Sequence, residues 1–302
     1  MTTTTVAPAP IRQHEPSRVR RSPSRGVSRA LRRLPIQILI GLLLVVEIYP
    51  IVWLAIGSFR TQSEFLNEPF WALPANFNLD NYVAVFTTGN FGQFILNSIT
   101  AVFPALALII VFGVAAGFAL EVMVWKGRGG VLLLFLAGIM VPAQMILLPL
   151  FTVYYRTNLM GSLWPLIITY TAIGLPLTVF MMATYFRAIP REMFEAATLD
   201  GASVLRSFWS VGFPMVRNAI FTVGLVQFFF IWNDLLIAIT FTNSSKLQTI
   251  QAGLLNFTGE YGAVQYGPTF AAICVSVFGT LVIYLVLNQR IMRGLSAGSV
   301  KG

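Results

Sequence analysis

Six apolar stretches, each long enough to cross a lipid bilayer as a helix, constrain the fold of this chain more than any other feature. A membrane-spanning helix needs roughly 20 consecutive, mostly apolar residues. Because lipid offers the backbone no hydrogen-bond partner, such stretches must satisfy their own polar groups as helices. The stretches are 36–59, 99–120, 131–154, 162–186, 219–242 and 269–287. The sequence therefore predicts an all-α polytopic membrane protein with six transmembrane helices.

The composition excludes several classes of protein. Hydrophobic residues make up 56% of the chain and charged residues 10%, whereas soluble domains carry about 25% charged residues. The single cysteine, Cys274, has no partner for an internal disulfide. The single histidine, His14, lies in a polar segment, and no HExxH motif is present. We therefore expect no catalytic residue and no metal site in this chain, which argues against an enzyme.

The basic residues indicate how the chain is oriented. Seventeen of the 20 lysines and arginines fall in segments that six spans would place on one side, namely 1–35, 125–130, 187–218 and 290–302. Positive charge concentrates on the cytoplasmic side of membrane proteins. We therefore expect both termini to be cytoplasmic. Topology accounts for the net charge of +9, so no nucleic-acid partner is expected.

Outside the spans, the chain divides into tails and loops. Residues 1–35 are rich in proline and arginine and are expected to form a disordered cytoplasmic tail. Residues 36–289 form the transmembrane domain, and 290–302 a second cytoplasmic tail. The external loops 60–98, 155–161 and 243–268 are large enough to meet a partner but too small to fold alone.

The cytoplasmic segment 187–218 is longer than a simple connection between helices requires. Pro190 suits the first turn of a helix, and Gly201 suits the left-handed residue that follows a helix end. A second, amphipathic helix is expected to begin near Val204 and to end before Pro214. From these residues alone, a docking site for another protein and an elbow lying flat on the membrane remain equally open.

The residues of this segment resemble a known motif. Glu195-Ala196-Ala197-Thr198-Leu199-Asp200-Gly201-Ala202-Ser203, followed by Phe208 and Phe213-Pro214, is similar to the EAA loop of ABC importer permeases. The glycine-rich end 294–302, Trp232-Asn233-Asp234 and Asn97-Ser98 resemble motifs of the smaller membrane subunit of maltose-type carbohydrate importers. The likeness runs from about residue 36 to 302. Asn218 departs from it, because many relatives have proline there.

This resemblance implies a permease subunit in a bacterial inner or plasma membrane that forms half of a translocation pathway for sugar. A separate ATPase would bind ATP and magnesium, since this chain has no G-x-x-x-x-G-K-[ST] phosphate loop. The implied partners are a second, homologous permease subunit, two ATPase subunits, an extracytoplasmic sugar-binding protein and the lipid bilayer. The implied ATPase contacts are of two kinds. They are Glu195, Ala196, Ala197, Asp200 and Gly201 in the loop, and Gly294, Gly298 and Lys301 in an extended tail.

Polar residues within the spans are candidates for the substrate pathway. Trp232, Asn233 and Asp234 combine an aromatic face with groups that bond hydroxyls, which is the chemistry of a sugar site. A structural hydrogen bond at a kink explains Asp234 equally well. Gln144 is a weaker candidate, because a lone amide in a span more often joins helices.

Two other functions compete with this interpretation. An ion-driven secondary transporter would need inverted repeats and a network of buried ionisable groups, and the sequence displays neither convincingly. An ABC permease for a non-sugar solute would share the EAA loop. The sequence does not specify which sugar is carried or whether the two ATPase subunits are identical.

Overall fold

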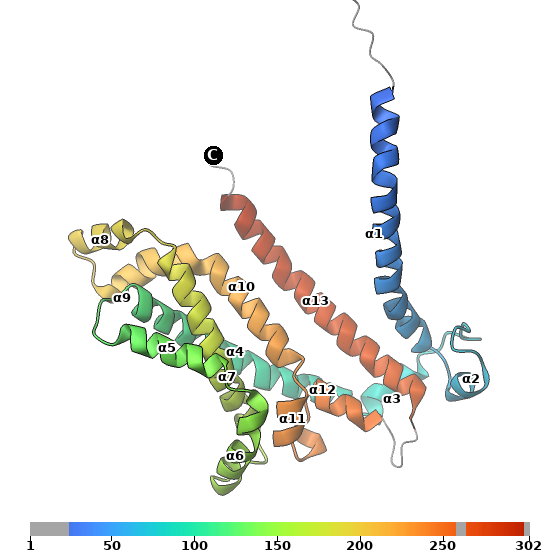
Figure 1. Cartoon of the computed structure of the whole chain (residues 1–302). Coiled ribbons are helices and arrows are strands. Elements are labelled where there is room, and N and C mark those ends of the chain that lie inside the picture. The colour runs from blue at the N-terminus through green and yellow to red at the C-terminus, as the bar shows by residue number, and fades with distance from the viewer. Residues whose placement is uncertain (1–23, 258–263, 299–302) are drawn as a thin grey trace, which may run out of the picture. The chain divides into compact units, whose positions relative to one another are not determined.

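A computed structural model describes the backbone of residues 24–257 and 264–298, and the side chains of 35–257 and 264–286. The chain divides into two compact units, Met1–Val52 and Trp53–Gly302. Every regular element of the described residues is helical (Figure 1). Helix α1, Ser24–Gly57, runs through the boundary between the units. It starts before the first expected span, so residues 24–35 of the expected disordered tail are helical.

Among the residues that the structure describes, five helices are long and apolar enough to cross a membrane, and they overlap all but one of the expected spans. Candidate spans are Pro35–Gly57, Phe91–Glu121, Trp164–Arg187, Val204–Trp232 and Tyr266–Val286. They belong to α1, α4 (Phe91–Glu121), α7 (Trp164–Arg187), α9 to α10 (Val204–Ser207 and Phe213–Trp232) and α13 (Tyr266–Gly298). The chain is therefore a multi-pass membrane protein of the all-α class.

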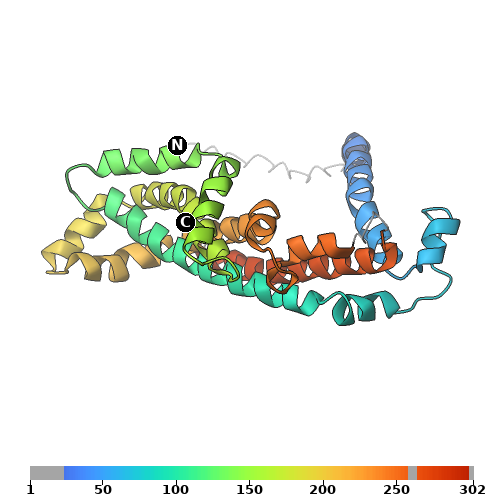
Figure 2. The same cartoon turned by 90° about the horizontal axis from the view of Figure 1, so that it is seen from below.

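The remaining expected span, 131–154, is broken into two helices. Helices α5, Arg128–Ile139, and α6, Ala143–Arg156, meet at an angle of 95°, and together they make up to six spans (Figure 2). Pro142 explains the break, because proline disfavours helical backbone in the preceding residue. The Tyr154 hydroxyl lies 3.0 Å from the Thr169 hydroxyl, which ties α6 to α7.

The fifth expected span, 219–242, is also broken into two helices. Helix α10 ends at Trp232, and a separate short helix, α11, runs from Leu236 to Phe241. The Asp234 carboxylate lies in the break and accepts the backbone N–H groups of Ile237 and Ala238, each at 3.1 Å. A carboxylate that satisfies the free N–H groups of a helix start stabilises the break. Hydrophobicity alone could not locate it, because apolar residues continue on both sides.

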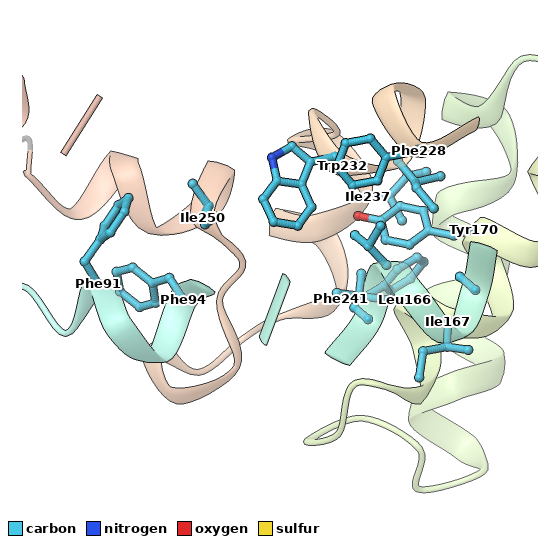
Figure 3. Close-up of a cluster of buried hydrophobic side chains, with 14 of the residues drawn as sticks. Phe91, Phe94, Leu166, Ile167, Tyr170, Phe228, Trp232, Ile237, Phe241 and Ile250 are labelled. Carbon is cyan, nitrogen blue, oxygen red and sulfur yellow. The ribbon is translucent and has the colours of Figure 1, made fainter. Parts of the chain in front are cut away.

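The connections between spans contain short helices. At the end of the spans that carries the expected external loops lie α2 (Gln62–Asn67), α3 (Asp80–Thr87), α12 (Ile250–Gly253), and the 3-10 turns η2 (Ser245–Leu247) and η3 (Leu254–Phe257). Helix α8, Arg191–Leu199, lies beyond the opposite end of α7 and α10 (Figure 1). Figure 3 shows the larger buried cluster, where Tyr170 lies close to the tilted ring pair of Phe228 and Trp232.

Helices α4 and α7 pack closely because α4 presents glycines to α7. A Cβ atom on Gly117 would lie 2.7 Å from Met182 Cβ and 3.0 Å from the Ala183 backbone nitrogen. The side chain of Gln227 on α10 bridges to α7, donating to the Gly174 carbonyl at 3.0 Å and to the Thr178 hydroxyl at 2.9 Å. Small residues and interhelical amide bonds are the usual stabilisers of packed membrane helices.

Substituting Gly117→Ala should destabilise the protein, because the new methyl group meets backbone atoms of α7 that cannot rotate away. The expected cost is about 1–3 kcal/mol, typical of an overpacked core. Gly92→Ala is the matched control on the same helix, since a Cβ there has nothing within 4 Å. Thermal unfolding in detergent should show a lowered midpoint for Gly117→Ala alone. Equal midpoints in the two variants would contradict the close packing.

Candidate functional site

Helix α8 begins where the sequence predicts, within one residue. Pro190 is the residue before the helix, with φ −55° and ψ 131°, and Glu192 lies in the first turn. Proline is tolerated at a helix start because the first N–H groups have no partner within the helix. An acid in the first turn also interacts favourably with the helix dipole. The expected helix through Glu195 is therefore confirmed.

The end of α8 is fixed by Gly201, as its residue type predicts. Gly201 has a φ of +79°, in the left-handed region that favours glycine. Its N–H donates to the Thr198 carbonyl at 3.0 Å, and the N–H of Ala202 donates to the Ala197 carbonyl at 2.9 Å. These two bonds are those of a Schellman motif. The chain therefore reverses sharply after α8, with the last carbonyls of the helix satisfied.

The loop residues expected to contact an ATPase lie on this short helix and its end. Glu195, Ala196 and Asp200 are exposed, whereas Ala197 is half-buried. Large apolar side chains accompany them on the surface, because Met193 is 46% and Leu199 88% exposed. An exposed helix that combines an acid with uncovered apolar groups is typical of a surface that meets a partner.

The second helix of the loop does not end before Pro214, as the sequence suggested. Helix α9, Val204–Ser207, continues through a π-helical segment, Phe208–Gly212, directly into α10. In the π segment the N–H of Phe213 donates to the Phe208 carbonyl, five residues back. A π turn widens the helix, and this accommodates the ring of Pro214 and its missing N–H without a break. The loop and the fifth span are therefore one helical stretch.

Aromatic rings connect the loop to the spans. Phe118 on α4 lies 5.5 Å from Phe186 on α7, 6.0 Å from Phe194 on α8 and 5.1 Å from Phe208, all in edge-to-face geometry. Each such pair contributes about 0.5–1.5 kcal/mol beyond the burial of area. Direct ring contacts therefore join α8 to the ends of α4 and α7.

An open cavity of about 740 Å³ lies beside this cluster, between α8 and the segment that follows α4. Its lining includes Glu121, Arg187 and Glu195. The Arg187 guanidinium donates to the Glu121 carboxylate at 2.8 Å and so joins the ends of α7 and α4. Sequence reasoning missed this ion pair, because its members are 66 positions apart and each simply closes a span.

The expected tail contacts lie at the end of α13 or beyond it. Helix α13 continues to Gly298, so Gly294 and Gly298 belong to a helix and not to an extended segment. Lys301 lies outside the described residues. The apolar run continues through Leu287, and helix formers follow it in the sequence, which accounts for the longer helix.

The candidate pathway residues separate into two groups. Trp232 is buried, and its indole N–H donates to the Thr280 hydroxyl at 3.0 Å. Asn233 is exposed and donates to the Phe229 carbonyl at 3.0 Å. Gln144 is exposed on α6, one residue after Ala143 of the bent pair. Trp232 thus packs between helices, whereas Asn233 and Gln144 are accessible.

Asp234 borders a second cavity, of about 490 Å³, at the bend between α5 and α6. Its Oδ2 atom accepts the Tyr170 hydroxyl at 3.0 Å, in addition to the two backbone bonds of the helix break. Gln227 and Tyr170 also line the cavity. The structural bond at a kink is therefore confirmed for Asp234. Sequence reasoning did not identify Tyr170, because a tyrosine in an apolar run carries no distinguishing pattern.

Replacing Gly201 with valine should disrupt the turn after α8, because left-handed backbone costs a residue with a Cβ roughly 1–2 kcal/mol. We expect faster amide hydrogen exchange over residues 197–202 while the spans remain protected. Gly201→Asn is the control, since asparagine tolerates this conformation better than most residues. Unchanged exchange in the valine variant would contradict the role of Gly201 in fixing the turn after α8.

Comparison with known proteins agrees with this architecture. Residues 109–292 match the family described as "Binding-protein-dependent transport system inner membrane component". The chain is 31% identical over 258 residues to the diacetylchitobiose uptake system permease protein NgcG of Streptomyces coelicolor, covering 85% of each chain. It is 28% identical to the multiple sugar-binding transport system permease protein MsmG of Streptococcus mutans, covering 86% of this chain and 93% of that one.

A solved structure of a bacterial ABC transporter that imports the acidic polysaccharide alginate has the same fold. Its TM-score is 0.76 at 20% identity, and the likeness covers 89% of this chain and 99% of that one. The matched family segment contains α8, the π segment and the helix break at Asp234. The chain is a transport component and not an enzyme. It belongs to the family of inner-membrane components of binding-protein-dependent transport systems.

Proposed function

We propose that this chain is the smaller of two membrane subunits in an ATP-driven importer of sugars. Membership of a binding-protein-dependent transport family supports import with the help of an extracytoplasmic binding protein. The sugar class rests on the relatives, whose names refer to diacetylchitobiose, multiple sugars and alpha-glucosides. The chain forms half of the pathway, and a second, similar permease subunit forms the other half.

The observation that carries this proposal is the exposed helix α8, which is held at both ends and coupled to the spans. Its end is fixed by the left-handed Gly201, and Phe194 contacts Phe118 of α4. In the proposed mechanism, α8 lies in a cleft of a separate ATPase subunit. Glu195 makes charged contacts there, and Ala196 and Ala197 allow close approach.

Closure of two ATPase subunits on ATP and magnesium would move α8 as a rigid unit. The ring contacts of Phe118 and the Arg187–Glu121 ion pair would then carry the movement to α4 and α7. Asp200 and Gly201 keep the reversal after α8 stiff, so that movement is not lost in a flexible loop. Gly294, Gly298 and Lys301, at the end of α13 and beyond, would provide a further contact with the ATPase.

For the substrate pathway we retain Asn233 and Asp234 as the leading candidates, with Gln144 beside them. Asn233 is exposed, and Asp234 lines the cavity at the α5–α6 bend. Carboxamide and carboxylate oxygens accept hydrogen bonds from sugar hydroxyls. Trp232 would act indirectly, because its indole bond to Thr280 holds the end of α10 against α13.

Uptake of a panel of labelled sugars tests this function in a strain that lacks only this gene. We expect selective loss of one sugar or sugar family, restored by the intact gene and not by Gly201→Val. Uptake should also require ATP and the binding protein. Transport that persists without ATP and collapses when the ion gradient is dissipated would instead indicate a secondary transporter, and loss of a non-sugar solute alone would overturn the sugar class.

The proposed orientation places both termini and α8 in the cytoplasm. In a Cys274→Ala background, a cysteine at Ser203 should not react with a membrane-impermeant thiol reagent in intact cells, whereas one at Ser63 should react. Both positions are exposed in the structure, so burial does not explain a difference. Labelling at Ser203 before the cells are broken would reverse the topology.

A further inference from the structure

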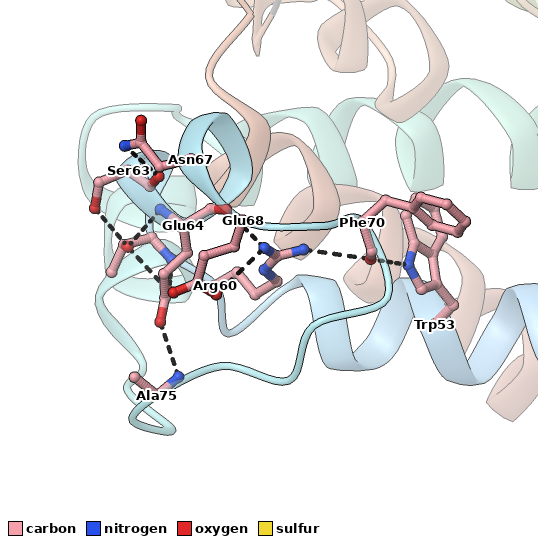
Figure 4. Close-up of polar contacts among 9 residues, drawn as sticks. Trp53, Arg60, Ser63, Glu64, Asn67, Glu68, Phe70 and Ala75 are labelled. Carbon is pink, nitrogen blue, oxygen red and sulfur yellow. Dashed lines mark hydrogen bonds and ion pairs between the residues drawn. The ribbon is translucent and has the colours of Figure 1, made fainter.

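The segment from Arg60 to Asp80 is folded around a buried arginine. Arg60 is 1% exposed, and its guanidinium donates to the Glu64 carbonyl at 2.6 Å and to the Phe70 carbonyl at 3.3 Å (Figure 4). The Glu68 carboxylate lies 3.8 Å away, and the Phe65 ring lies 4.8 Å from the guanidinium carbon. Arg60 is the only basic residue between positions 60 and 80, and the segment's own residues surround its guanidinium.

Further contacts attach the segment to α1 and α13. The indole N–H of Trp53, in the last turns of α1, donates to the Phe70 carbonyl at 2.7 Å. Phe65 stacks on Tyr266 at 5.4 Å and packs against Phe270 at 5.0 Å, both at the start of α13. Because α1 ends at Gly57 and α13 begins at Tyr266, these contacts hold the segment at the level where two spans leave the bilayer.

The carboxylate of Glu64, in the first turn of α2, is also held within the segment. The Glu64 carboxylate accepts the N–H of Thr61 at 2.6 Å and that of Ala75 at 2.8 Å. These backbone bonds, with Thr61 first, lower the pKa of Glu64 below its ordinary value. The carboxylate thus closes the loop on itself, and its bonds do not require a partner molecule.

Six large apolar side chains of this anchored segment are nevertheless uncovered. We call them the apolar loop face. They are Leu66, Phe70, Trp71, Leu73, Phe77 and Leu79, which are between 59% and 71% exposed. They lie within 14 consecutive positions of one loop. Large exposed apolar groups gathered in this way mark an interaction surface and are rare on surfaces that face water.

We propose that the apolar loop face inserts into the interfacial region of the bilayer, beside the ends of α1 and α13, and anchors this side of the protein in lipid. Tryptophan and other aromatic rings favour the level of the lipid headgroups. The loop is continuous with a membrane span and is bonded to a second one, so its height relative to the lipid is set by the spans themselves.

A lipid surface fits this face better than a docking protein does. A binding protein that dissociates in each transport cycle would leave all six side chains in water, whereas lipid covers them throughout. Charge gives a second argument. The segment carries three acids, Glu64, Glu68 and Asp80, and one base, Arg60, which is buried. With no free base, insertion should not depend on anionic lipid, unlike the binding of basic segments.

Spin labelling of the assembled transporter in zwitterionic phosphatidylcholine vesicles tests the proposal. The label is placed at Phe77→Cys or Leu73→Cys in a Cys274→Ala background, and at Ser63→Cys as a control. Figure 4 shows Ser63 on the far side of Arg60 from Phe70. Collisions with oxygen, which dissolves in lipid, are compared with collisions with a water-soluble nickel chelate.

We expect the ratio of oxygen to nickel collisions at 77 and 73 to be several times that at 63. Adding anionic lipid or salt should leave the ratio unchanged. Equal ratios at 77, 73 and 63 would overturn the proposal. Protection of 77 and 73 from both reagents would also overturn it, because the face would then be covered by protein. If that protection appears only when loaded binding protein is added, the partner is the binding protein.

Discussion

The close contact of α4 with α7 is the interaction on which the rest of the described structure depends. Gly113 and Gly117 let the two helices approach until α4 meets side-chain and backbone atoms of α7. One residue after Gly117, Phe118 meets rings from α7, α8 and the π segment. In a membrane the hydrophobic effect does not drive helices together, because lipid tails are as apolar as the side chains. Close packing is therefore a main source of helix association there. The position of α8 relative to the spans therefore follows from this contact.

Breaks in the membrane helices are the second feature of the architecture, and the one in the fifth span is capped by a side chain. An unsatisfied backbone group in lipid costs several kcal/mol. Asp234 caps the helix after the break in the fifth span. The π segment, with its bond from the Phe213 N–H to the Phe208 carbonyl, leads into α10 through Pro214. Gly201 closes the end of α8 in the same sense. The bends thus belong to the fold and give the chain discrete places at which helices can change direction.

Hydrophobic length predicted the class of fold and the approximate position of the long helices, because the bilayer imposes that length on any sequence. It did not predict that 131–154 is bent or that 219–242 is broken after Trp232. The position of Gly201 was predictable too, since few residues other than glycine adopt its backbone conformation. The break at Asp234 and the continuity through Pro214 were not, because neighbouring residues are equally apolar in a broken and an unbroken helix. The Arg187–Glu121 pair and the Tyr170–Asp234 bond join distant segments, which no local pattern reveals.

The central claim is that α8 is the surface through which a separate ATPase moves the membrane helices. A photoactivatable cross-linking residue at the exposed Ala196, in the transporter assembled in cell membranes, tests it most directly. The account predicts a covalent adduct with an ATPase subunit whose yield changes when ATP is bound. The same residue at the exposed Asn256 should give no such adduct. Cross-linking at position 196 to lipid alone would contradict the account, because α8 would then lie flat on the membrane.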